Sequence, residues 1–373
     1  MAIICGVGSV CQADERLRLD AKINGKPVTL FFDTGSSAFT LWRETAQRLG
    51  ITVSKPADFS GAPYLAQISE ECKLSLEGRT GKTKFIVVEN KSNVSLNFDG
   101  VIGWGQLTEP EDKKIVRIDV ESQRITFLDK VPGYALKWTQ LPVVLNSNTL
   151  KLEIRNSGED DGILDVDTGA PHGVSLAPRQ WSMWKAEHAN QPTTIDSFYM
   201  PAGGIVTVEE SWAMKLVLGP LVLSDLPVGE SAPIEQQLGG KRYVGSLGLA
   251  ALKRFDVIID SKHGVAYLRP KKSHHAPYPH NRLGAAFVPA STRSDELVGR
   301  VAPGSPAQAA GVKNGDVLLK VDGIDVTLRS PGAMKKFWTA AGTKVNLMLK
   351  RDGDTFETTA ILREILPPVD GEK

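Results

Sequence analysis

The chain has 373 residues, of which 41% are hydrophobic, enough for two or three domains with ordinary cores. Its 44 Lys and Arg residues nearly balance 43 Asp and Glu residues, so the basic surface that nucleic-acid binding requires is not expected. The sequence has no stretch of 18 apolar residues, which argues against a membrane-spanning helix. It also lacks the serine-hydrolase elbow, the phosphate-binding loop, Cys-x-x-Cys and His-Glu-x-x-His.

Residues 1–13 differ in character from the rest. A short apolar run from Ala2 to Val10 is followed by Cys11-Gln12-Ala13, which suits cleavage by signal peptidase, although no Lys or Arg precedes the run. An ordinary first strand is the alternative. Removal of this segment would leave Cys72 as the single cysteine, and avoidance of cysteine suits an oxidising compartment. We therefore expect a signal peptide, complete or truncated, and a periplasmic or secreted protein.

The tripeptide Asp-Thr-Gly occurs twice, beginning at Asp33 and at Asp167, and each copy follows a strand-turn-strand pattern. Alternating residues on either side of Asn24-Gly25 predict a hairpin whose second strand runs directly into Asp33. Residues 149–167 have the same pattern around a longer turn. A lone Asp-x-Gly is often only a turn after a strand. Two copies in matching contexts favour a common role.

Later features repeat in the same order. Gly-Val-Ile-Gly at 100–103 follows the first motif, and Gly-Ser-Leu-Gly at 245–248 follows the second. A strand pair around a polar turn comes after each, at 116–128 and at 257–268. A duplicated β-rich lobe accounts for this arrangement. Two such lobes would deliver two carboxyl groups to one point, where they would share a proton.

Residues 14–270 resemble the retropepsin-like aspartic proteases, the family of the viral and pepsin-type enzymes. Asp33 and Asp167 match the catalytic pair of that family. The resemblance implies a mainly β fold with two tandem acid-protease lobes, at 14–138 and 139–270, and a water activated by the Asp pair without cofactor or metal. The residues expected to support the pair are Thr34, Gly35, Ser36, Ile102 and Gly103 in the first lobe and Thr168, Gly169, Ala170, Leu247 and Gly248 in the second.

The sequence departs from the family pattern in the flaps, the hairpins that cover the cleft. No Tyr-Gly-x-Gly is present, and the candidate flap tips are Gly61 and Tyr64 in lobe one and Gly203 and Gly204 in lobe two. Asp165 precedes Asp167 by two residues, so strand alternation points both side chains to the same side.

The two motifs also differ after the glycine, where Ser36 corresponds to Ala170. A hydroxyl group can donate to the adjacent carboxylate and favour its ionised form, whereas a methyl group cannot. We therefore expect Asp33 to carry the charge and Asp167 the shared proton.

Residues 271–281 are rich in Pro and His and have no periodicity, which predicts a solvated linker rather than a metal site. Residues 282–366 resemble the PDZ domains of bacterial envelope proteases, through Pro-Gly-Ser-Pro-Ala at 303–307 and Gly-Asp-Val-Leu at 315–318. Residues 367–373 form a short tail. The linker leads us to expect a module that is independent of the Asp pair.

The PDZ resemblance implies that an extended peptide binds beside a sheet edge. The loop that would offer backbone N–H groups to a terminal carboxylate contains Leu283, Gly284, Ala285, Ala286 and Phe287. Met334, Phe337 and Trp338 are candidates for the side-chain pocket, and plain core positions are the alternative for all three.

Together these patterns predict an aspartic endopeptidase whose PDZ domain binds the C-termini of peptides or proteins. A catalytically inactive peptide-binding protein of the same fold is the alternative. A third possibility is an active site formed between two chains. We expect a monomer with an intramolecular Asp pair, polypeptide substrates, no nucleic-acid partner and no transmembrane segment.

Overall fold

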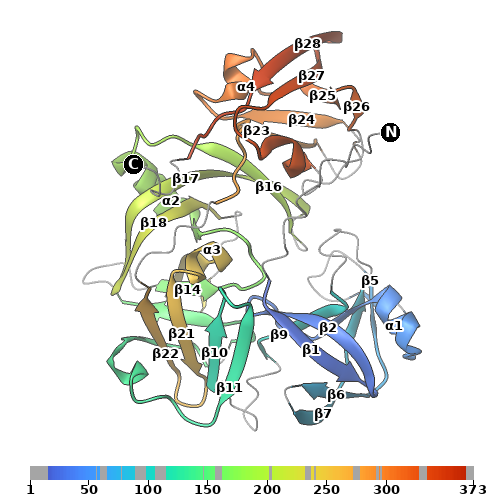
Figure 1. The fold of residues 1–373 in the computed structure, drawn as a ribbon, viewed down its shortest axis with the longest axis vertical. Coiled ribbons are helices and arrows are strands. Elements are labelled where there is room, and N and C mark those ends of the chain that lie inside the picture. Colours follow the sequence, from blue (N-terminus) through green and yellow to red (C-terminus); the bar gives the residue numbers. More distant parts are fainter. Residues whose placement is uncertain are drawn as a thin grey trace, which may run out of the picture.

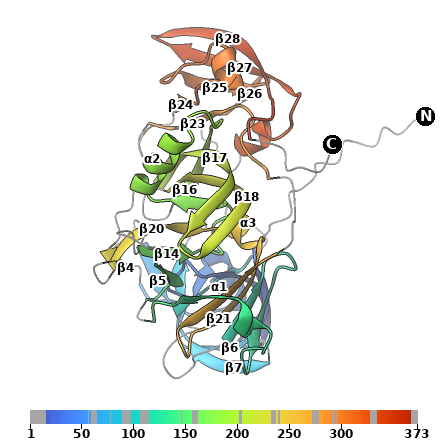
Figure 2. The ribbon, with the colours of Figure 1, turned by 90° about the vertical axis from the view of Figure 1, so that its left-hand side faces the viewer.

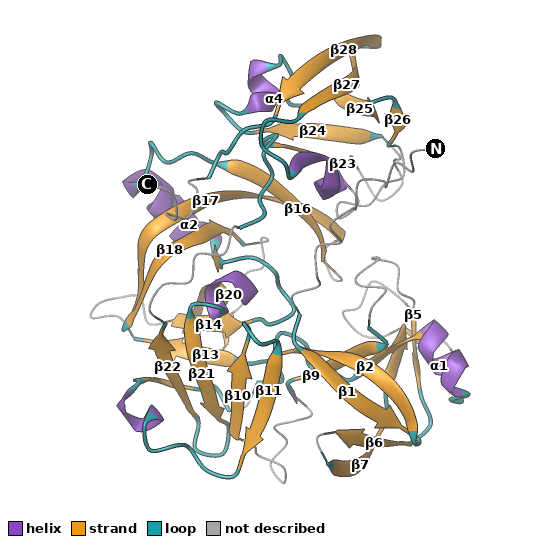
Figure 3. Cartoon of the chain, in the orientation of Figure 1, coloured by secondary structure: helices purple, strands orange, loops and turns teal. Residues whose placement is uncertain are grey.

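A computed structural model describes residues 16–55, 57–58, 65–76, 78–88, 98–105, 115–145, 147–155, 162–200, 204–231, 237–238, 241–271, 278–290, 294, 296–326 and 334–366. The expected signal peptide, the C-terminal tail and the flap residues Gly61, Tyr64 and Gly203 lie outside these ranges. Strands dominate the described residues and helices are short, which confirms the mainly β fold (Figure 3). In this part of the chain, no helix has the length and apolar character needed to cross a bilayer.

The first lobe forms a sheet with the order β4-β5-β8-β3-β9-β2-β1-β6-β7. Its elements are β1 (Arg18–Ile23), β2 (Lys26–Asp33), β3 (Thr40–Trp42), α1 (Arg43–Leu49), β4 (Ala57–Asp58), β5 (Leu65–Ile68), β6 (Cys72–Leu76), β7 (Arg79–Thr83), β8 (Ile86–Val88) and β9 (Gly100–Gly103). Asn24 and Gly25 both have positive φ, as a two-residue hairpin turn requires, so the β1–β2 hairpin forms as expected. This hairpin delivers Asp33 at the end of β2.

The second lobe repeats this order of elements. It contains β13 (Lys151–Ile154), β14 (Gly162–Val166), β15 (Val174–Leu176), α2 (Pro178–Glu187), β16 (Thr194–Met200), β17 (Gly204–Leu218), β18 (Leu221–Glu230), β19 (Gln237–Leu238), β20 (Lys241–Leu247) and α3 (Leu249–Leu252). The sheet order is β13-β14-β20-β15-β18-β17-β16, with β19 paired to β20. The β16–β17 hairpin follows the Asp loop and a helix, as the β4–β5 hairpin does in lobe one.

A further sheet contains strands from both lobes. It has the order β11-β10-β21-β22-β12 and is formed by β10 (Ile115–Asp119), β11 (Arg124–Leu128), β12 (Thr139–Pro142), β21 (Phe255–Asp260) and β22 (Val265–Pro270), with the short helix η2 at Ala135–Lys137. β10 pairs directly with β21 in antiparallel fashion (Figure 1). The division of the chain at 138/139 therefore does not separate two independent sheets.

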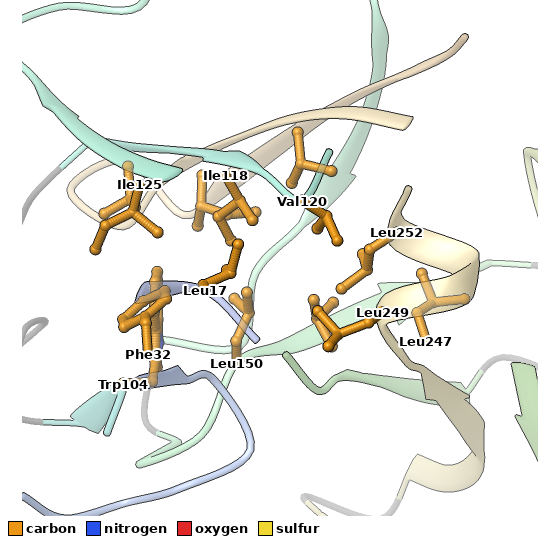
Figure 4. Close-up of a cluster of buried hydrophobic side chains, with 14 of the residues drawn as sticks. Leu17, Phe32, Trp104, Ile118, Val120, Ile125, Leu150, Leu247, Leu249 and Leu252 are labelled. Atoms are coloured by element: carbon orange, nitrogen blue, oxygen red, sulfur yellow. The ribbon is translucent and has the colours of Figure 1, made fainter. Parts of the chain in front are cut away.

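The main core lies between this shared sheet and the two Asp loops. Ile118, Val120 and Ile125 of the sheet region pack with Phe32, which precedes Asp33, and with Leu247 of the second lobe (Figure 4). All are buried. The shared core therefore fixes the position of one Asp loop relative to the other.

The PDZ-like module has its own core, centred on Leu318, Leu347 and Leu349. Its elements are β23 (Ala285–Pro289), β24 (Leu297–Val301), α4 (Pro306–Ala309), β25 (Val317–Val321), β26 (Ile324–Asp325), η3 (Lys336–Trp338), β27 (Lys344–Arg351) and β28 (Asp354–Ile361). The sheet order is β23-β24-β25-β27-β28, with β26 paired to β25. β23 is thus an edge strand of this module.

The module has the separate core that was expected, but it also packs on the β16–β17 hairpin of lobe two (Figures 1 and 2). Ile195 of β16 forms a small buried cluster with Ala286 and Ala302 of the module. The end of the expected linker is not solvated, since the exposed fraction of His280 is only 6%. Small residues such as Ala286 give no sign in the sequence that they cover another domain.

The shared core predicts the effect of one truncation. Ile118→Ala should lower the free energy of unfolding by about 2–5 kcal/mol, because a buried side chain would leave a cavity. Thermal unfolding of the variant and the parent measures this loss. Ile361→Ala is the matched control, because Ile361 is 56% exposed and its truncation should change little. Equal melting temperatures for Ile118→Ala and the parent would contradict the role of the shared core.

Candidate active site

Each Asp loop begins where a strand ends beside a parallel neighbour. β2 pairs with β9, which puts Asp33 opposite Gly103 and Phe32 opposite Ile102. In lobe two β14 pairs with β20, and the backbone N–H of Asp167 donates to the carbonyl oxygen of Leu247 at 2.9 Å. Gly248 continues this support, donating its N–H to the carbonyl oxygen of Gly173 at 2.8 Å. The structure thus brings the expected supporting segments against both loops.

Two threonines connect the loops reciprocally. The N–H of Thr34 donates to Oγ1 of Thr168 at 3.0 Å, and the N–H of Thr168 donates to Oγ1 of Thr34 at 3.0 Å. Each hydroxyl then donates across to the other lobe, Thr34 to the carbonyl oxygen of Val166 at 2.5 Å and Thr168 to that of Phe32 at 2.8 Å. Both threonines are fully buried. Buried hydrogen bonds of this kind hold the two loops in one fixed arrangement.

The connection brings each carboxyl group against the glycine of the opposite loop. A Cβ atom added to Gly35 would lie 2.7 Å from Cγ of Asp167, and one added to Gly169 would lie 2.6 Å from Cγ of Asp33. Any side chain at either position would therefore collide with a carboxyl group. The two glycines allow Asp33 and Asp167 to approach within hydrogen-bonding distance of each other.

Burial of Asp33 and, second, the negative charge of Asp167 raise the pKa of Asp33 to about 8. The hydrogen bond to the Asp167 carboxyl acts in the same direction, whereas the N–H of Gly35 and the charge of Arg16 oppose it. Two carboxyl groups at this distance cannot both ionise easily, so the pair retains one proton at neutral pH.

Ser36 does not have the contact with Asp33 that was expected from the sequence. Ser36 Oγ donates to the carbonyl oxygen of Ala38 at 3.3 Å and not to Asp33. Asp167 Oδ1 accepts two backbone N–H groups, from Gly169 at 2.9 Å and from Ala170 at 3.2 Å. The backbone donor to Asp33 among the described residues is Gly35, at 2.8 Å. The hydroxyl donor expected at Asp33 is therefore not formed, and the pKa of Asp33 is raised rather than lowered.

Two further groups lie near Asp167. Asp165 forms an ion pair with Lys151, with Oδ1 and Nζ 2.5 Å apart, and burial raises the pKa of Asp165 while Lys151 opposes the shift. His172 lies in the loop that follows Asp167, and its ring centroid is 5.3 Å from that of Phe198 in β16. Burial lowers the pKa of His172, which favours the neutral ring. Sequence reasoning missed His172, because a single histidine after a turn carries no distinctive pattern.

The candidate flap tips lie between the paired strands β4 and β5 in lobe one and β16 and β17 in lobe two. Of the four flap residues, Gly204 is described, and it opens β17. Both hairpins therefore have the position in the chain that a flap requires.

The candidate groove residues of the PDZ-like module serve mainly as its core. Leu283, Ala285, Phe287, Met334 and Trp338 are buried together, and Phe337 packs partly buried against them. Ala286 points instead toward lobe two. For Met334, Phe337 and Trp338, core positions were the alternative that the sequence analysis had left open.

Asn281 fills the loop that was expected to bind a terminal carboxylate. Its Oδ1 accepts the N–H groups of Leu283 at 3.0 Å and Gly284 at 3.1 Å. Sequence reasoning assigned Asn281 to the linker. The available signal was an Asn two and three residues before those donors, the spacing at which Asn side chains bond to the backbone.

Comparisons with known proteins agree with this arrangement in two segments. Residues 19–104, which include Asp33 and Gly103, match the sequence model of aspartyl proteases, and residues 297–351 match that of PDZ domains. The fold and these matches define the class of protein: an aspartyl-protease-like region and a PDZ domain in one mainly β chain. Such a combination indicates a protease-like, peptide-binding protein.

A curated protein is similar to part of the chain. The chain is 40% identical over 89 residues to the magnetosome formation protease MamE of Paramagnetospirillum magneticum. The match covers 21% of this chain and 12% of the length of MamE. The likeness therefore concerns one segment and not the whole of that protein.

The raised pKa of Asp33 predicts a pH-dependent gain in stability for Asp33→Asn. The folded-state pKa of about 8 lies above the ordinary 3.8, so the parent loses stability as pH rises from about 4 to about 8. The Asn side chain does not ionise, and the variant should therefore equal the parent near pH 3 and exceed it near pH 8. The rise in Tm near pH 8 should be at least roughly 2–4 °C, the shift that about 1 kcal/mol produces in large domains.

Thermal unfolding of both proteins across this pH range measures the difference. Asp20→Asn is the control, because the Asp20 side chain is 77% exposed and should give no such gain. A Tm difference between Asp33→Asn and the parent that is independent of pH would contradict the raised pKa.

Proposed function

We propose that this protein is an aspartic endopeptidase in which Asp33 and Asp167 activate a water molecule. The main support is the close approach of the two carboxyl groups, each against the glycine of the opposite loop, held by the reciprocal Thr34 and Thr168 hydrogen bonds. Two carboxyl groups that repel each other lower the stability of the fold. A protein without catalytic activity would therefore be more stable if one of them were replaced by an uncharged side chain. The match of residues 19–104 to aspartyl proteases supports the same reaction class.

The raised pKa of Asp33 suits it to the role of the acid. Asp167 takes a proton from the water as the water oxygen attacks the peptide carbonyl carbon, and Asp33 donates its proton to the carbonyl oxygen. The tetrahedral intermediate then collapses as Asp167 gives its proton to the departing nitrogen and Asp33 recovers one from the hydroxyl group. The C–N bond breaks, and the pair ends with one shared proton, as it began.

We further propose that the PDZ domain binds the C-termini of peptides or proteins along β23. The strand register directs the backbone N–H and C=O of Phe287 away from β24, toward the outer edge of the sheet. A peptide strand added there would have partners for its own backbone. In the alternative, a catalytically inactive peptide-binding protein, the edge of β23 would bind the peptide and the Asp pair would have no catalytic role.

The endopeptidase proposal predicts that Asp33→Asn and Asp167→Asn each lower kcat by at least roughly 100-fold, since each variant removes half of the acid–base pair. Cleavage of a denatured protein by the folded variants, with and without pepstatin, measures the loss. Asp165→Asn serves as a neighbouring carboxylate control and should retain activity. Equal cleavage by all variants and the parent would leave the binding-protein alternative.

The intramolecular pair makes a second prediction. A mixture of the Asp33→Asn and Asp167→Asn proteins should remain inactive, because the Thr34 and Thr168 bonds join loops of one chain. Size-exclusion chromatography of the parent should give the mass of a monomer. Recovery of activity on mixing would instead indicate a site shared between two chains.

The pKa of Asp33 makes a third. Loss of the shared proton should end catalysis, so activity should fall as pH rises through about 8. A pH profile of kcat/KM for the parent locates this limb. Full activity well above pH 9 would rule out a protonated Asp33 as the acid.

A further inference from the structure

We propose that Asn281 couples the PDZ domain to the β16–β17 hairpin beside the active site, so that a peptide C-terminus that displaces Asn281 releases the hairpin and accelerates hydrolysis. The inference rests on the proposed function and assigns a regulatory role to its PDZ domain.

Asn281 links the two parts through opposite ends of one amide group. Its Oδ1 accepts the N–H groups of Leu283 and Gly284, at 3.0 and 3.1 Å, in the carboxylate-binding loop. Its Nδ2 donates to the carbonyl oxygen of Ile195 in β16 at 2.8 Å, and to that of Ala285 at 2.8 Å. The contact with β16 and the occupation of the loop therefore depend on the same side-chain position.

Adjacent residues of β16 strengthen this attachment. Thr194 Oγ1 donates to the carbonyl oxygen of Asn281 at 2.6 Å, and Ile195 is buried against Ala286 and Ala302. Asp196 accepts from Lys335 Nζ at 2.8 Å. Lys335 lies in the helical segment that also carries Met334 and Trp338. The loop and the helix that flank the expected peptide position thus both contact residues 194–196.

The same strand leads to the Asp pair. Phe198, two residues beyond Asp196, packs its ring against His172, whose loop continues from Asp167. Hairpins that cover an active site have to move to admit substrate and release product. Contacts at three successive residues of β16 oppose such a movement, so loss of one of them, the Asn281 Nδ2 bond, should make the hairpin easier to displace.

A peptide carboxylate and Asn281 Oδ1 compete for the same two N–H groups. A carboxylate forms the stronger, charge-assisted bonds, so a bound C-terminus would expel the Asn281 side chain. When the Asn281 side chain moves out of the loop, its Nδ2 bond to the carbonyl oxygen of Ile195 is also lost. Because the two contacts exclude each other, the coupling is reciprocal: a peptide end loosens the hairpin, and a docked hairpin weakens peptide binding.

The test uses the full chain, a short quenched substrate blocked at both ends, and a pentapeptide ending in free Val. The same pentapeptide with a C-terminal amide is the matched control. The free acid should raise kcat/KM about 5-fold or more, the lower range of allosteric effects, and should increase hydrogen exchange at residues 194–200. The amide should do neither. A free acid that binds without changing either quantity, or that fails to bind, would overturn the coupling.

Two substitutions separate the two ends of Asn281. Asn281→Ala frees the loop N–H groups and should bind the free acid several-fold more tightly, with a raised basal rate and no further activation. Asn281→Asp keeps an acceptor for the loop but loses the donor to Ile195, so it should raise the basal rate and weaken peptide binding. Lys215→Ala, at an exposed position of β17, should behave as the parent.

A purely structural Asn281 predicts a different result, in which both substitutions slow hydrolysis and Asn281→Ala weakens peptide binding. If the parent hydrolyses no peptide, the proposed function fails, yet exchange at residues 194–200 with the free acid and the amide still tests the coupling. If the parent is active but indifferent to the free acid, the coupling alone fails.

Discussion

The mutual repulsion of two half-buried, closely apposed carboxylates is the constraint on which this structure depends. Asp33 and Asp167 lie against each other's glycines, where ionisation of both would be strongly unfavourable. The arrangement persists because the surrounding structure supplies compensation: reciprocal threonine bonds, backbone donors to each carboxyl group, and a core shared by both lobes. A single retained proton follows from this geometry, and with it a pair of groups able to act as acid and base.

Features encoded by local sequence could be predicted before the structure. The Asn24-Gly25 turn and the strands that lead to the two Asp residues follow from short patterns. The PDZ-like module was recognisable for the same reason, since its glycines and prolines mark turns in a fixed order. Each of these features depends on residues close together in the chain.

Features that depend on distant contacts could not be predicted in this way. The pairing of β10 with β21, the packing of Ala286 on Ile195 and the ion pair of Lys335 with Asp196 join segments far apart in sequence. The role of Ser36 was mispredicted because its hydroxyl group donates to the carbonyl oxygen of Ala38 and not to the Asp33 carboxylate. Asn281 was assigned to a linker by composition, although its partners lie in two domains.

The sheet formed by both lobes has a consequence for the integrity of the chain. β10 and β21 hold the halves together through backbone pairing and a buried core, so their association does not depend on the continuity of the peptide link between the lobes. A chain nicked in the connection after β12 would therefore keep its halves associated. The arrangement resembles a dimer of similar subunits that have been joined into one chain. The contacts that would hold such a dimer together here hold the two lobes of one chain together.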